Sequence, residues 1–130
     1  MSTKFVGVVA MLLTLVTGTG LAHHSGSMFE KEKTVTLTGV VKEFQYTNPH
    51  SWLIVDVETD GKVVSWGFEA EGPSTLGRAG IRKSDFAPGT KITITGRPMR
   101  DGRPAAFWLK AVRLSDNKEF LPSAGFATKS

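Results

Sequence analysis

The residues of this chain best suited to chemistry are its three histidines, of which His23 and His24 are adjacent and His50 lies further along. If the chain is cut after Ala22, His23 presents a free α-amine beside its imidazole. Such a chelating pair of nitrogens suits Cu(II) or a similar borderline ion. His24 and His50 can each add an imidazole, so nitrogen ligands dominate, and the pattern predicts copper or zinc as the bound ion.

A carboxylate can complete this metal site. We expect Glu69 to supply the oxygen, with Glu71 and Asp56 as alternatives. The spacing of these residues is not a closed ligand motif. In the competing interpretation the two N-terminal histidines are only polar residues tolerated at a cleavage site, and His50 hydrogen-bonds the turn that follows Pro49.

A second set of residues predicts a different kind of ligand. Tyr46, Trp52 and Trp108 can stack on a sugar or a base, and Arg100 can attract an acidic group. The alternative hypothesis is therefore a protein that binds an extended acidic or sugar ligand without a metal. Large aromatic side chains are usually buried, however, so Trp52 and Trp108 can equally be caps of the core, and Arg100 can be part of a solvated loop.

Catalysis has weaker support in the sequence than binding. Glu69 and Glu71 share a face of an extended strand and could form a carboxylate pair, but no nucleophile and base accompany them. Ser51 is next to His50 in the sequence only, and such adjacency is not a triad. We therefore expect a binding protein and not an enzyme.

The first 22 residues have the organisation of a secretory signal peptide. Lys4 precedes a mostly apolar stretch over residues 5–16, and the segment ends in small residues at Ala22. Thr14 and Thr17 dilute the apolar stretch, which argues against a transmembrane helix. We expect export, cleavage after Ala22 and no membrane span in the mature protein.

The composition of the chain limits the remaining possibilities. At 130 residues it is long enough for one domain with a real core, and we expect a monomer. The formal net charge of +4 is too small and too scattered to indicate nucleic acid binding. With no cysteine, the chain has neither thiolate metal sites nor thiol catalysis.

Alternating apolar and polar residues predict five strands, at residues 34–44, 52–58, 63–70, 91–97 and 105–114. A helix of about two turns is expected after Pro73, since proline suits the first turn of a helix. In the first strand the alternation slips at Gly39, which indicates a bulge or a tight coil.

Strand order and segment composition together predict the architecture. The order β-β-β-α-β-β with a coiled first strand is that of a five-stranded OB-like β-barrel, and an open sheet or a small sandwich is the alternative. We place a flexible N-terminal arm at 23–33, the barrel domain at 34–120 and a loose C-terminal tail at 121–130.

Four sequence blocks, taken together, resemble the DUF6152 family of small exported bacterial proteins. The blocks are HHS, VTLTGVVKEFQYTNPHSW, WGFE followed by EGPSTLGRAG, and PGTKITITGRPMRDGRPAAFW, covering about residues 23–114. The resemblance implies a single exported β-barrel domain, located in the periplasm, and no established activity. Members share the histidine pair, the Thr-Asn-Pro-His segment that ends at His50, and an acidic residue that corresponds to Glu69. Ile81 departs from the tryptophan of many members, which weakens any argument for an aromatic pocket there.

Overall fold

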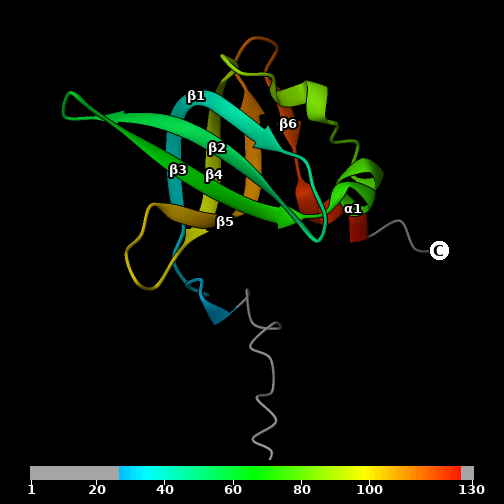
Figure 1. Cartoon of the computed structure of the whole chain (residues 1–130), viewed down its shortest axis with the longest axis horizontal. Helices are drawn as coiled ribbons and strands as arrows, with labels where there is room; N and C mark the ends of the chain where they lie inside the picture. The colour runs from blue at the N-terminus through cyan, green and yellow to red at the C-terminus, as the bar shows by residue number, and fades with distance from the viewer. Residues whose placement is uncertain (1–26, 127–130) are drawn as a thin grey trace, which may run out of the picture.

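The computed structural model of the protein describes residues 27–126, and the predicted signal peptide, His23 and His24 lie outside this range. The described residues form a β-barrel with one short α-helix and two 3-10 helices (Figure 1). The elements are β1 (Val35–Gln45), β2 (His50–Thr59), β3 (Lys62–Glu71), α1 (Pro73–Arg78), η2 (Lys83–Phe86), β4 (Lys91–Pro98), β5 (Ala105–Arg113), β6 (Lys118–Phe120) and η3 (Pro122–Phe126).

Five of the strands close into a barrel. They pair in the order β3-β2-β1-β4-β5, and a parallel pairing of β3 with β5 joins the two ends of the sheet. All other neighbours are antiparallel, and β6 adds to the free edge of β5. The predicted barrel with the order β-β-β-α-β-β is confirmed.

Alternate residues of each strand fill the barrel, because successive side chains of a strand point to opposite faces. In β2, for example, Leu53 and Val55 are fully buried while Ile54 and Asp56 are only half-buried. Aromatic rings close one end of the core: Phe86 of η2 lies 5.6 Å from Phe44 and 5.3 Å from Trp108, measured between ring centroids. The sequence predicted only a turn over residues 84–89, where η2 lies, and no element where β6 lies.

Two details of β1 and β2 differ from the sequence prediction. The register shift of β1 falls between Val41 and Glu43, not at Gly39. Gly39 instead permits a close approach, since a Cβ there would lie 2.8 Å from Val55 Cγ1 and would also meet the carbonyl oxygen of Asp56. The second strand begins at His50, which was predicted to lie in the preceding turn. His50 is therefore held by a strand.

The segments at both ends of the described range pack against the barrel. In the predicted arm, Phe29 is only 2% exposed and forms a β-bridge with Met99, so the part of the arm from residue 27 is docked. The prediction of a loose tail differs from the structure over residues 121–126, where η3 packs beside α1. Gly125 makes this contact possible, because a Cβ at that position would collide with Thr75.

Candidate functional site

The pairing of β2 with β3 gathers His50 and the two candidate glutamates on one face. His50 is the register partner of Glu71, and Trp52 is the register partner of Glu69. Directly paired residues point to the same side of a sheet, and so do residues two apart in one strand. These four side chains therefore share the outer face of the barrel, opposite the buried Leu53 and its neighbours.

Glu69 is buried although it lies on the outer face, being 3% exposed. Its register partners are Trp52 on β2 and Phe107 on β5, so an aromatic residue flanks it on either side. Gly67 leaves room for the tryptophan, since a Cβ there would approach the Trp52 ring to 3.2 Å. The carboxylate is thereby shielded from water without entering the core.

The imidazole of His50 is the polar partner of this buried carboxylate. His50 Nδ1 lies 2.9 Å from Glu69 Oε1, and the His50 side chain is 35% exposed. Within the described part of the chain, Glu69 Oε2 is buried without a hydrogen-bond partner, and Nδ1 is buried with the ion-pair contact alone. The two side chains form one unit in which the carboxylate lies behind the ring.

Burial sets the acidity of Glu69. Loss of solvation raises the pKa of its carboxyl group above the ordinary value, because burial penalises the charged form. The nearby His50 acts in the opposite direction and lowers this pKa, while the negative charge of Glu71 raises it. His50 is therefore what favours a charged carboxylate at this position.

The predicted metal ligands are only partly brought together by the structure. Among residues 27–126 no group of three or more His, Asp or Glu side chains is arranged to hold a metal ion. His50 and Glu69 form a pair, and the other two predicted ligands, His23 and His24, lie outside the described residues. Asp56, an alternative oxygen donor, instead accepts a hydrogen bond from Ser65 at 2.5 Å.

The residues considered for catalysis are not arranged as a nucleophile and base. Ser51 is fully buried and its hydroxyl donates to the carbonyl oxygen of Thr47 at 3.3 Å, whereas His50 lies on the opposite face of the strand. Glu69 and Glu71 do share a face, and the imidazole of His50 contacts the first of them.

The four residues predicted to bind an extended ligand are dispersed. The prediction that Trp108 binds a ligand is wrong. Trp108 is 1% exposed and its ring packs against Phe44 and Phe86, so it belongs to the core. The Tyr46 hydroxyl donates to the carbonyl oxygens of Pro73 and Ile81, the latter at 2.8 Å. Arg100 Nε donates to the carbonyl oxygen of Phe29 at 3.1 Å. Trp52 alone of the four lies beside Glu69.

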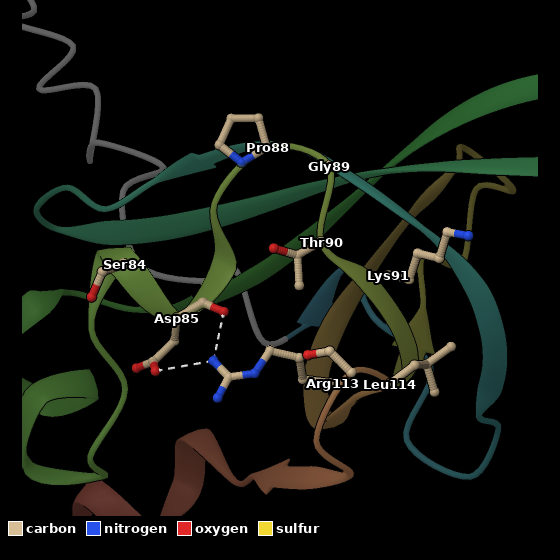
Figure 2. Close-up of a pocket in the computed structure, with 9 residues that line it drawn as sticks. Ser84, Asp85, Pro88, Gly89, Thr90, Lys91, Arg113 and Leu114 are labelled. Atoms are coloured by element: carbon tan, nitrogen blue, oxygen red, sulfur yellow. Dashed lines mark hydrogen bonds and ion pairs between the residues drawn. The ribbon is translucent and has the colours of Figure 1, made fainter.

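A groove lies between η2, the start of β4 and the end of β5, away from the His50–Glu69 pair (Figure 2). Arg113 lines this groove and donates to the carbonyl oxygen and carboxylate of Asp85 and to both carboxylate oxygens of Asp116. Two carboxylates therefore satisfy this guanidinium, and the groove does not present it to an acidic ligand. The role of Arg113 in the structure is to hold η2 against β5.

Sequence reasoning did not identify Phe107 or Gly67 as parts of the site. Both are placed there by pairings between distant parts of the chain, since Phe107 reaches Glu69 only through the parallel closure of the barrel. The sequence predicted Phe107 on the core face, whereas the structure buries Ala106 and Trp108 and places Phe107 on the outer face beside Glu69.

The fold and the site define a small, closed, OB-like β-barrel protein with a His–Glu pair on its outer surface. The chain belongs to DUF6152, a family of unknown function, whose model matches residues 11–107. No curated protein and no solved structure matches the chain. None of the helices within residues 27–126 is long and apolar enough to cross a membrane.

Proposed function

We propose that this is an exported, periplasmic metal-binding protein that holds a copper or zinc ion at His50 with the help of the mature N-terminus. The observation that carries the proposal is the contact of His50 Nδ1 with the buried Glu69 carboxylate at 2.9 Å. In metal sites a ligating imidazole commonly turns its second nitrogen to a carboxylate, which fixes the orientation of the ring and makes it a better ligand.

This geometry supports a specific role for each of the two side chains. His50 Nδ1 faces Glu69, which leaves Nε2 as the nitrogen for the ion, and 35% of the side chain is exposed. Glu69 is then the partner that orients the ring, and not the direct oxygen ligand expected from the sequence. One imidazole does not hold an ion alone, so His23 and His24 supply the remaining nitrogens.

The test uses untagged protein purified after export, with the mass of the mature chain checked for a start at His23. Calorimetry with Cu(II) and Zn(II) is expected to show a sub-micromolar site that is lost in His50→Ala and in His23→Ala. Glu69→Gln is expected to weaken binding about 10-fold to 100-fold, as is usual for the partner of a metal-bound histidine.

Two controls separate this site from adventitious binding. Glu58→Gln changes an exposed carboxylate of the same strand as His50 and is expected to leave the affinity unchanged. Acetylation of the α-amine removes a nitrogen donor without changing a side chain, and is expected to weaken Cu(II) binding. A wild-type protein that shows no sub-micromolar site would overturn the proposal.

The alternative function, binding of an extended acidic or sugar ligand, has less support from the geometry. Trp108 lies in the core, and Tyr46 and Arg100 are engaged by backbone carbonyl groups. Tryptophan fluorescence tests it directly, because Trp52 is half-buried on the outer face. A change on adding oligosaccharides or polyanions that is absent in Trp52→Phe would favour this alternative.

A further inference from the structure

The first half of β3 has a free edge. The hairpin of β2 and β3 projects beyond the other strands of the barrel (Figure 1). β2 pairs with β3 along the whole strand, whereas β5 pairs only with residues 67–69 of it. Among the strands of residues 27–126, none therefore pairs with the second edge of Lys62–Trp66. A free edge of this kind can pair with a strand of another chain.

The backbone groups on this edge belong to alternate residues. Gly67 N donates to the carbonyl oxygen of Pro104, on the side of β3 that faces away from β2. The direction of the N–H and C=O groups alternates along a strand, so Val63 and Ser65 point theirs to that same side. The residues between them point these groups to β2 instead. Val63 and Ser65 thus offer their N–H and C=O groups to a further strand.

The side chains of this edge are mostly apolar and exposed. Val63 is 65% exposed on the outer face, and Val64 is 39% exposed on the inner face, where it lies two residues from the half-buried Trp66. Natural proteins often protect free edges with a proline, a bulge or a charge. This edge has no proline and no register shift against β2, and its one charge, Lys62, lies beside the turn. The edge is therefore suited to being covered.

A second copy of the same edge fits this one in an antiparallel register. With Val64 of each copy on a twofold axis, Val63 pairs with Ser65 of the second copy in the hydrogen-bonded manner, so every free backbone group of the two residues is used. Val64 then faces Val64 of the second copy as a non-hydrogen-bonded pair, in which the side chains lie closest. Lys62 faces Trp66, which allows a cation–π contact.

Other antiparallel registers of the two edges use fewer of these groups. If Val63 pairs with itself, Ser65 lies opposite Gly61, which belongs to the turn and has a φ of 75°. If Ser65 pairs with itself, Val63 lies opposite Gly67, whose N–H is already bonded. The register centred on Val64 is the one that the structure favours.

We propose that this protein forms a twofold-symmetric dimer by antiparallel pairing of Lys62–Trp66 with the same segment of a second copy. The contact is isologous, since the same surface is used on both copies, and it closes without leaving an edge for a third. One short edge buries less than the roughly 800 Å² per partner of a stable complex, so we expect the dimer to be reversible. The monomer expected from the length of the chain is then its dissociated form.

Sedimentation equilibrium of the untagged exported protein tests the proposal, with a chelator present so that no ion links two copies. A monomer–dimer equilibrium is expected at concentrations below about 1 mM. Val64→Lys places two ammonium groups on the axis and should abolish the dimer. Val40→Lys is the matched control, because Val40 is also 39% exposed but lies in β1 between two paired strands.

A second variant removes a hydrogen bond and not a side-chain contact. The N–H of Val63 faces the free edge, so Val63→Pro deletes this donor without removing a bond to β2. Two hydrogen bonds are lost from the symmetric dimer, and the dimer should weaken about 10-fold or more. Circular dichroism checks that each variant is folded.

Mixing two variants tests the register. Neither Val64→Lys nor Val64→Glu should dimerise alone, whereas the mixture should, because opposite charges then meet on the axis. In NMR spectra of the wild type, the amide signals of Val63 and Ser65 should shift with concentration more than that of Val40. A wild type that stays monomeric up to about 1 mM would assign the edge to a strand of another protein and overturn the proposal. A dimer that persists in Val64→Lys would also overturn it.

Discussion

Removing the imidazole of His50 is expected to destabilise the metal-free protein, because it leaves a buried carboxylate without its polar partner. Glu69 is 3% exposed and one of its oxygens already lacks a hydrogen bond within the described chain. In His50→Ala the contact that lowers the pKa of this carboxyl group, and so favours its charged form, is gone. The fold must then hold an uncompensated charge or take up a proton.

The geometry of the contact sets the scale of this effect. His50 Nδ1 lies 2.9 Å from Glu69 Oε1, which is hydrogen-bond distance, and the His50 side chain is 35% exposed, so water weakens the contact. An orphaned buried partner costs about 1–3 kcal/mol, and we expect His50→Ala to lose that much stability at pH 7.

Urea unfolding at pH 7 with a chelator present measures this loss, and a double-mutant cycle with Glu69→Gln assigns it. In the Glu69→Gln background the same change should cost less than about 0.5 kcal/mol, since no charge is left to be orphaned. Lowering the pH should reduce the cost of His50→Ala, because the raised pKa of Glu69 lets the folded variant bind a proton. Equal costs in the two backgrounds would refute the reasoning.

Two further predictions concern other parts of the fold. Arg113 lowers the pKa of Asp116 to about 2, so the stability that this carboxylate contributes is complete above its unfolded pKa and is lost as the pH falls toward 2. In unfolding measured from pH 2 to 6, the difference between Asp116→Asn and the wild type should therefore be smallest at pH 2, grow as the pH rises, and level off above about pH 4. Phe86→Ala should cost about 3–5 kcal/mol in urea unfolding, since this fully buried ring contacts three other aromatic rings. Phe126→Ala, at a site 57% exposed, is its control, and a similar cost for both would contradict the packing argument.

Local sequence patterns determine much of this fold. The strands of residues 91–98 and 105–113 were predicted almost to the residue, because the alternation of apolar and polar side chains acts over short distances. The docking of Phe29 was missed because its partner, Met99, is 70 positions away. Short segments such as β6 owe their structure to a neighbouring strand and carry no period of their own.

In the candidate site, too, the features that depend on neighbouring strands along the chain were predictable, and those that depend on distant pairings were not. That His50 and Glu69 could meet was predictable, since a hairpin joins their two strands. The burial of Glu69 was not, because it depends on Phe107 across the parallel closure and on the space left by Gly67. Trp108 was assigned to a ligand face from its residue type, although residue type alone favours the interior for a large aromatic ring.

The parallel pairing of β3 with β5 that closes the barrel involves few residues, and this determines where the barrel opens most easily. Only Gly67, Phe68 and Glu69 of β3 pair with β5, whereas the pairing of β3 with β2 runs along the whole strand. Proteins open locally where contacts are fewest. We therefore expect the β3–β5 pairing to separate before the other strand pairings of the barrel. Hydrogen exchange at the amide of Gly67, which donates to the Pro104 carbonyl oxygen across this pairing, should therefore be faster than in the middle of β2. An ion bound beside Glu69 would stabilise the β3–β5 pairing and slow that exchange.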